Sequence, residues 1–285
     1  MKKWIVLILI FVLLTTTISF GSIGDKLSNH WAKEEVDKAF VANYFPYLTK
    51  NNFEKFDPSG PISEQEFNLS LNSLLKDFEF EVKGLGGNYH MSRGDMINIL
   101  GSKLLAFGIK DEASSNIPFI DTNTMNSNSI VLLRLLYNHG IIKGDSNSSF
   151  GPGRGLSQAE AIILLQRVKG VLEKMNNIAF ETLGIVQTFN NQEEIIVINE
   201  DKKVLVTITK QFPTPGYSMS VNKVMRTGGD YKIYFDITPP KPDSIQLQVI
   251  TYKTLTLEIE KSKLGNPPYK FTFDGYNKIS IKESM

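Results

Sequence analysis

The spacing of apolar residues divides the chain into two parts. Up to about residue 170, apolar positions recur every three to four residues, which is the period of one face of an α-helix. Later in the chain they alternate with polar positions over short runs, which is the period of a strand. This change predicts a helical part at 25–170, a linker at 171–184 and a β-rich part at 185–285.

The most regular helical unit lies between residues 119 and 160. Within it, Gly140 can take the left-handed conformation that ends a helix predicted at 128–139. Ser157 is a good N-cap, and Glu160 can bond back to it, so a capping box opens a second helix. The residues placed on one side of the first helix are Val131, Leu132, Leu135 and Leu136.

The same kind of helix start occurs twice more upstream. Ser63 is followed three residues later by Glu66. Ser92 is followed at the same spacing by Asp95. Because a serine hydroxyl and a following carboxylate satisfy two orphan N–H groups, the sequence predicts three equivalent helix N-termini.

The order of features in 119–160 resembles the S-layer homology repeat. The matching features are Ile-Asp at 120–121, Gly-Ile-Ile-Lys-Gly at 140–144, Phe-Gly-Pro at 150–152 and Ser-Gln-Ala-Glu at 157–160. Members of that family usually carry three tandem copies that form a pseudo-threefold helical bundle and bind bacterial secondary cell-wall polysaccharide. The resemblance therefore implies an all-α bundle in the N-terminal part.

Two further repeats are implied in worn form. The first rests on 29–36, with Asn-His-Trp-Ala, and on 56–66, with Phe-Asp-Pro and a Ser-Glu-Gln-Glu start. The second is short and degenerate, and rests on Met-Ser-Arg-Gly-Asp-Met at 91–96. The implied repeats occupy 25–80, 81–112 and 113–170.

The family's ligand is an acidic glycan, often with a pyruvyl ketal, and the resemblance implies a basic site for it. A guanidinium can clamp a carboxylate with two parallel hydrogen bonds. Arg93 keeps the family's arginine, whereas Glu64 would repel a carboxylate and Gln158 offers only neutral bonds. The candidate glycan-binding residues are Arg93, Trp31, Ser92, Asp95, Gln158 and Gly144.

Plainer interpretations of this region stay open. Trp31 could stack on a sugar ring, but a tryptophan at a helix start is also a common core anchor. Arg93 could be a solvated residue of a first helical turn. The repeats could also be a structural or dimerising scaffold without glycan affinity.

The amino terminus predicts export. Lys2 and Lys3 precede an apolar run at 4–14, and Ser19 and Gly21 put small residues at the minus-three and minus-one positions of a cleavage site. This predicts a signal peptide at 1–21. The alternative is an uncleaved signal anchor, although the 17 uncharged residues from Trp4 to Phe20 fall short of the roughly 20 that span a bilayer.

Composition narrows the location and the partners. The chain has no cysteine, so neither a lipid anchor nor a disulfide framework is available, and we expect attachment to be non-covalent or absent. The resemblance to the S-layer homology repeat implies a bacterial cell wall or cell surface as the location. The chain's 285 residues, 41% hydrophobic fraction and net charge of +1 suit two ordinary domains and argue against nucleic acid as a partner.

The C-terminal part predicts an antiparallel β-sandwich or open barrel, and hence a multidomain α+β chain. Gly228 and Gly229 form a hairpin turn signal between two of its strands. The strand-like runs lie at 204–209, 219–225, 231–237, 246–252, 254–260 and 269–273.

A second resemblance covers about 204–260. Pro-Thr-Pro-Gly-Tyr-Ser at 213–218, a Pro-rich turn at 238–243 and Gln-Val-Ile-Thr-Tyr at 248–252 resemble the C-terminal domain of the PrcB type. That resemblance implies a module that binds another protein, for example to stabilise or inhibit a secreted protease. The candidate contact loop is Pro213, Thr214, Pro215, Gly216 and Tyr217. Alternatively the loop simply turns the chain, and its tyrosine packs over the edge of the sandwich.

The signatures of common enzymes are missing from the sequence. It has no cysteine nucleophile, no Gly-x-Ser-x-Gly elbow, no phosphate-binding loop and no His-Glu-x-x-His pair. We therefore expect no enzyme activity, metal or cofactor. A glycan-processing enzyme with paired carboxylates stays as the weakest alternative.

Overall fold

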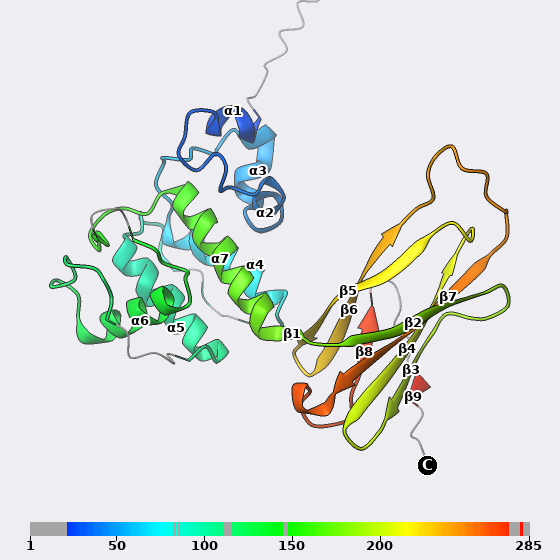
Figure 1. The fold of residues 1–285 in the computed structure, drawn as a ribbon. Helices are drawn as coiled ribbons and strands as arrows, with labels where there is room; N and C mark the ends of the chain where they lie inside the picture. The colour runs from blue at the N-terminus through cyan, green and yellow to red at the C-terminus, as the bar shows by residue number, and fades with distance from the viewer. Residues whose placement is uncertain are drawn as a thin grey trace, which may run out of the picture.

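The computed structural model describes residues 22–81, 84, 86–110, 116–144, 148–273 and 280–281 (Figure 1). The predicted signal peptide at 1–21 lies outside the described residues. Helices occupy the N-terminal half and two β-sheets the C-terminal part, so the predicted α+β class is confirmed.

The helical part contains helices of very different length. None of the helices in the described ranges is both long and apolar enough to cross a membrane. The helices are α1 (Ile23–Leu27), α2 (Lys38–Tyr44), α3 (Pro46–Phe53), α4 (Glu64–Lys76), α5 (Arg93–Phe107), α6 (Ser127–Asn138) and α7 (Gln158–Asn176).

The three predicted capping boxes are confirmed at the starts of α4, α5 and α7. In each, the serine hydroxyl oxygen accepts a bond from the N–H three residues on, and the acidic side chain accepts one from the serine N–H. The donor–acceptor distances lie between 2.9 and 3.2 Å. The pairs are Ser63 with Glu66, Ser92 with Asp95, and Ser157 with Glu160.

The residues just before these three serines form a closed ring of backbone hydrogen bonds. Ile62 N–H donates to the carbonyl of Leu156 at 3.0 Å, and Leu156 N–H donates to Met91 at 2.8 Å. Met91 N–H completes the ring by donating to Ile62 at 3.0 Å. All three side chains are fully buried, so the ring lies in the hydrophobic core.

Loops from neighbouring segments also accept bonds from the first helical residues, and these bonds run in the opposite cyclic order. The first residue of each of α4, α5 and α7 donates its N–H to a carbonyl of one of these loops. No carbonyl within the helix can accept a bond from that N–H group. The bonds run from Glu64 to Tyr89 (3.0 Å), from Arg93 to Arg154 (2.9 Å) and from Gln158 to Gly60 (2.9 Å).

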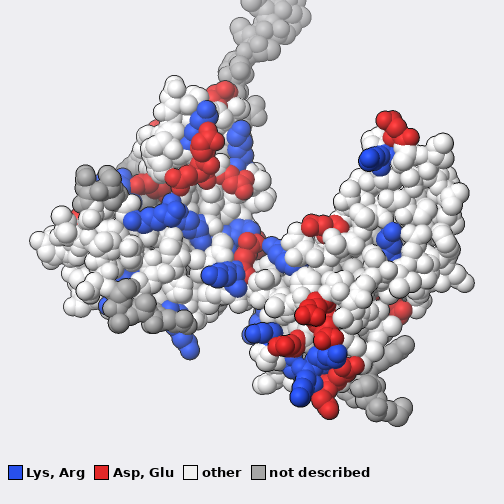
Figure 2. Space-filling model, in the orientation of Figure 1, with Lys and Arg blue, Asp and Glu red and all other residues white. Residues whose placement is uncertain are grey.

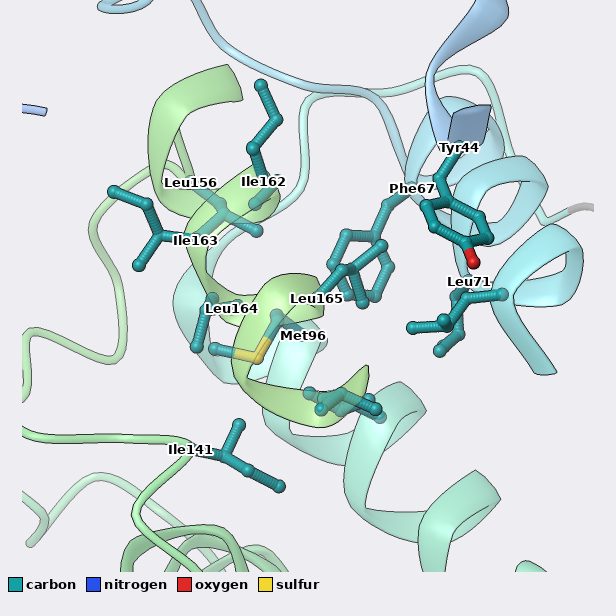
Figure 3. Close-up of a cluster of buried hydrophobic side chains, with 14 of the residues drawn as sticks. Tyr44, Phe67, Leu71, Met96, Ile141, Leu156, Ile162, Ile163, Leu164 and Leu165 are labelled. Atoms are coloured by element: carbon teal, nitrogen blue, oxygen red, sulfur yellow. The ribbon is translucent and has the colours of Figure 1, made fainter. Parts of the chain in front are cut away.

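Helix α7 contributes a continuous set of side chains to the helical core. Figure 3 shows Ile162 and Leu165 of α7 in one cluster with Phe67 of α4 and Met96 of α5. On α6, the predicted inward position Val131 is 42% exposed, and Leu133 is fully buried instead. The helix therefore presents a slightly different face from the one the spacing indicated.

The predicted linker at 171–184 is not a linker. Helix α7 continues to Asn176, and β1 (Asn177–Ile178) follows it directly. Leu172 is buried in the helical core and Ile178 in the β core, so both ends of the junction are fixed by burial. The β part accordingly starts before residue 185.

The β part consists of two sheets with the orders β1-β5-β6-β8 and β2-β7-β4-β3-β9. Neighbouring strands are antiparallel except for the pairs β6 with β8 and β3 with β9. Buried residues of both sheets share one core. The remaining strands are β2 (Glu181–Thr188), β3 (Glu194–Asn199), β4 (Lys203–Phe212), β5 (Ser218–Thr227), β6 (Asp230–Thr238), β7 (Thr251–Glu260), β8 (Phe271–Phe273) and β9 (Ser280–Ile281).

Most of the predicted strands are confirmed. The runs at 204–209, 219–225, 231–237 and 254–260 lie inside β4, β5, β6 and β7. Gly228 and Gly229 form the turn between paired Thr227 and Asp230. The strand predicted at 246–252 begins only at Thr251, because neither β2 nor β4 extends beyond the residues paired with Thr251 and Tyr252.

The two parts are in direct contact. Met225 of β5 is buried in the helical core, and Lys223 forms a 2.9 Å ion pair with Glu173 of α7. Glu173 also pairs with Lys169 at 2.6 Å. Burial acts to raise the pKa of Glu173, but these two lysines hold that pKa below its ordinary value. On the face in Figure 2, charges of both signs are interspersed over both parts.

Candidate functional site

A cavity of about 280 Å³ lies on the helical part and gathers segments that are distant in the sequence. It brings together three of the predicted glycan-binding residues, Trp31, Arg93 and Gly144. These come from the three segments assigned to separate repeats. The lining residues are Trp31, Glu35, Arg93, Ile142, Lys143, Gly144, Glu160, Ile163, Leu164 and Arg167.

Trp31 lines this cavity and is exposed to solvent. Its side chain is 60% exposed and lies 5.3 Å from the ring of His30, measured between centroids. The interpretation of Trp31 as a core anchor is therefore wrong. No helix starts at Trp31, and the neighbouring Ala32 and Val36 fill the core instead.

Arg93 is nearly buried, so the interpretation of a solvated first-turn residue is wrong as well. Its side chain is 11% exposed and forms a 3.0 Å ion pair with Glu160. Its Nε donates to the carbonyl of Phe150 at 2.7 Å, and its guanidinium lies 4.7 Å from the centre of the Phe150 ring. Arg93 thus attaches the loop before α7 to the start of α5.

Glu160 concentrates the charge interactions of the site. It accepts bonds from Arg93, from Arg154 at 2.6 Å and from the N–H of Ser157 at 3.0 Å. Burial acts to raise the pKa of Glu160, but the Arg154 and Ser157 bonds and the charge of Arg93 hold that pKa below its ordinary value. Glu160 is therefore ionised at neutral pH and neutralises part of the cavity's positive charge.

Among the residues that the structure describes, the positive charge of the cavity that no carboxylate neutralises is that of Lys143. Arg167 pairs with Glu35 at 3.1 Å and donates to the carbonyl of Ile141 at 3.3 Å. Within the described ranges, Lys143 forms no ion pair. The cavity therefore offers an ammonium group beside an exposed indole.

Gly144 is required by the packing of the cavity wall. Its φ is +75°, in the region that favours glycine. A Cβ at this position would lie 2.2 Å from Cε1 of Phe119. The glycine lets the chain turn over the Phe119 ring and places Lys143 at the cavity.

Comparison with known families gives one match in each part. Residues 133–162 match the S-layer homology domain, and residues 203–260 match the PrcB C-terminal domain. The chain thus carries both domains, in that order. A search of curated proteins found no significant match to the chain. The first match includes Lys143, Gly144 and Glu160 of the cavity and implies association with the cell wall or cell surface.

The other predicted site residues lie outside the cavity. Ser92 and Asp95 bond to each other in the capping box of α5 and line a different hollow. Gln158 is only 8% exposed, and its side-chain oxygen accepts the N–H of Asp57 at 3.1 Å. Ser92 and Asp95 thus support the start of α5, and Gln158 supports the loop at Asp57.

In the described part of the chain, the environment of Arg93 is not repeated at the first helix start. Glu64 occupies on α4 the position that Arg93 has on α5, and it accepts the N–H of Gly87 at 2.8 Å. Glu64 thus caps a loop rather than lining a basic cavity.

Sequence reasoning missed Glu35, Lys143 and Arg167 as lining residues. For Lys143 a signal exists, because it is the variable residue of the Gly-Ile-Ile-x-Gly run. Arg167 follows Glu160 by seven residues, which is two turns along the same face of a helix. Glu35 carries no local signal, because only the tertiary fold brings it beside α7.

In the PrcB-type domain, the loop from Pro213 to Gly216 leads to a partly buried tyrosine. Tyr217 stacks on Phe212, with ring centres 5.4 Å apart and planes at 26°, and packs against the β core. Thr214 is buried. This packing favours the interpretation in which the loop turns the chain and its tyrosine covers the sheet edge.

Proposed function

We propose that the helical part docks non-covalently on an acidic secondary cell-wall polysaccharide through the cavity beside Trp31. The observation that carries this proposal is the exposed indole of Trp31 beside Lys143, in a cavity that gathers segments of all three repeats. The S-layer homology match over 133–162 supports a wall glycan as the ligand class.

The lining residues suit different parts of such a ligand. The indole face of Trp31 offers a stacking surface for a sugar ring. Lys143 offers positive charge to a carboxylate, such as that of a pyruvyl ketal. Arg93 has a positioning role, because its bonds to Glu160 and Phe150 hold the loop that borders the cavity.

The proposal treats the helical part as a pseudo-threefold bundle of repeats at 25–80, 81–112 and 113–170. The cyclic bonds among Ile62, Met91 and Leu156, and the equivalent capping boxes that follow them, support three related units. The two sheets with their shared core support a sandwich for the C-terminal domain.

Export completes this part of the proposal. The sequence pattern at 1–21 and the S-layer homology match support a secreted protein held at the bacterial cell surface. Cleavage of the signal peptide is tested by mass spectrometry of the mature amino terminus. We expect Ser22 to be the first residue. A protein that retains Met1 or Lys2 would support a signal anchor instead.

Wall binding is tested by co-sedimentation of residues 22–285 with purified bacterial cell walls, and with walls stripped of their polysaccharide. We expect retention on intact walls alone. Trp31→Ala and Lys143→Ala should reduce retention at least tenfold, whereas Lys50→Ala, an exposed lysine of α3 outside the cavity, should leave it unchanged. Equal retention of all variants would refute the cavity as the glycan site.

The alternative is a scaffold without glycan affinity. Its supporting observation is that Glu160 and Glu35 already neutralise Arg93 and Arg167. Under this alternative, the unaltered protein would not sediment with intact walls at any protein concentration.

Both matched domains belong to non-catalytic families, and the absence of reducing-sugar release from the same walls would argue against the remaining enzyme alternative.

For the C-terminal domain we propose binding to another protein. The PrcB C-terminal match over 203–260 supports a protease-related partner. The test is capture from culture supernatant on immobilised residues 22–285, with identification of retained proteins by mass spectrometry and an assay of their protease activity. Retention of no protease would remove the protease-related part of this proposal.

A further inference from the structure

The segment before β7 has the pattern of a strand but pairs with no other strand. Residues 245–250 read Ile-Gln-Leu-Gln-Val-Ile, with strict apolar and polar alternation over the first five. In the described ranges, this segment has no backbone hydrogen bond to another strand. The chain from β6 to β7 arches away from both sheets (Figure 1). The Val249 carbonyl accepts a bond from the Thr251 hydroxyl at 3.1 Å, but strand-forming residues are left without a ladder of backbone bonds to a neighbouring strand.

The apolar side chains of this segment face solvent. Ile245 is fully exposed, and Leu247 and Val249 are 69% and 37% exposed. Gln246, on the opposite side, lies against Gly216 of the preceding loop. Gln246 is partly buried there, whereas Gln248 is exposed, and the apolar side chains are directed outward.

The usual protection of a free strand edge is missing here. Native proteins guard such edges with charged side chains, prolines or bulges. Lys241, Pro242 and Asp243 precede the segment, but 245–250 contains no charge, proline or glycine. An unguarded apolar strand on a surface indicates a place where another strand pairs.

The sequence of the segment identifies the pairing strand as a second copy of itself. Ile-Gln-Leu-Gln-Val at 245–249 is close to a palindrome about Leu247. In an antiparallel pair centred there, Ile245 meets Val249 of the other copy and Gln246 meets Gln248. Apolar side chains then lie opposite apolar ones, and glutamines opposite glutamines. A twofold interface needs this self-complementarity.

We propose that residues 245–249 pair antiparallel with the same residues of a second copy, so that the β domains join into a twofold dimer. Leu247 of one copy lies opposite Leu247 of the other. No charge on the segment opposes the approach of the two copies. This dimer does not depend on wall binding, because the cavity lies on the helical part.

The first test is sedimentation equilibrium of residues 22–285 across the micromolar range. We expect the mass to rise from that of one copy to that of two. Leu247→Lys should abolish the rise, because it places two like charges opposite each other, whereas Val131→Lys, at an exposed apolar position of α6, should leave it unchanged. A single-copy mass at every concentration, or a dimer that persists in Leu247→Lys, would overturn the proposal.

A second test uses the absence of cysteine from the chain. Leu247→Cys should form a covalent dimer on mild oxidation, because residues directly opposite in an antiparallel pair have Cβ atoms about 4.5–5.5 Å apart. A mixture of Gln246→Cys and Gln248→Cys should cross-link more than either variant alone. Val131→Cys is the exposed control. Equal cross-linking of Leu247→Cys and Val131→Cys would contradict the proposed register.

Discussion

Arg93 of α5 and Glu160 of α7 form a 3.0 Å ion pair in which both side chains are almost buried. Glu160 also closes the capping box of its own helix. One carboxylate thus stabilises a helix start and neutralises the arginine of a neighbouring helix. This double role explains why Arg93 can keep its charge without being directed at solvent.

Glu160→Gln should destabilise the protein by about 2–3 kcal/mol, because it leaves a nearly buried guanidinium without its carboxylate. Glu66→Gln is the matched control, since Glu66 holds the same capping position on α4. There we expect a loss below about 1 kcal/mol. Urea unfolding measures both changes, and equal losses would show that the ion pair adds nothing.

Asp121 should make stability dependent on pH in the acid range. Burial acts to raise its pKa, but bonds from the N–H groups of Phe150 and Gly151 and from the Ser149 hydroxyl lower the pKa to about 2. Because the folded pKa is below the unfolded value, the contribution is present above about pH 4 and is lost as pH falls towards 2. The melting temperature of the protein should fall over this window.

Asp121→Asn supplies the control for that pH dependence. The variant should be less stable at neutral pH, because an amide accepts fewer bonds than a carboxylate. Its melting temperature should also fall less steeply between pH 4 and pH 2. Parallel curves for the two proteins would assign the acid sensitivity to other groups.

Gly144→Ala should destabilise by about 2 kcal/mol or more, because its positive φ and the 2.2 Å approach to Phe119 leave no space for a methyl group. Gly170→Ala is the matched control. Gly170 lies inside α7 with no heavy atom near its Cβ position, so alanine should stabilise by about 0.5–1 kcal/mol. Opposite signs in thermal unfolding are the expected result.

Met225→Ser should weaken the contact between the two domains. Met225 belongs to β5 but is buried in the helical core, where a hydroxyl is costly. We expect calorimetry to change from one unfolding transition to two. The exposed residue Met175 of α7 provides the control, and Met175→Ser should keep a single transition.

Local signals in the sequence predicted the local structure well. The three capping boxes are confirmed because a serine and an acidic residue three positions apart interact within one helical turn. The turn at Gly228 and Gly229 is confirmed for the same reason. Such features depend on neighbouring residues and need no knowledge of the rest of the fold.

Features set by distant contacts were not predictable in this way. The exposure of Trp31 depends on which residues of its segment reach the core. The burial of Arg93 depends on Glu160, which is 67 residues away. The strand at 246–252 failed over most of its length because a strand needs a neighbour, and no sequence pattern shows where β2 and β4 end.

The ring of hydrogen bonds among Ile62, Met91 and Leu156 fixes the order in which the helical part can be completed. The first two members cannot close the ring until Leu156 has been synthesised and brought back across more than ninety residues. The starts of α4 and α5 therefore keep an open hydrogen-bond position until the chain up to Leu156 is present. The starts of α4, α5 and α7 are thus held together by backbone bonds that none of them can form alone.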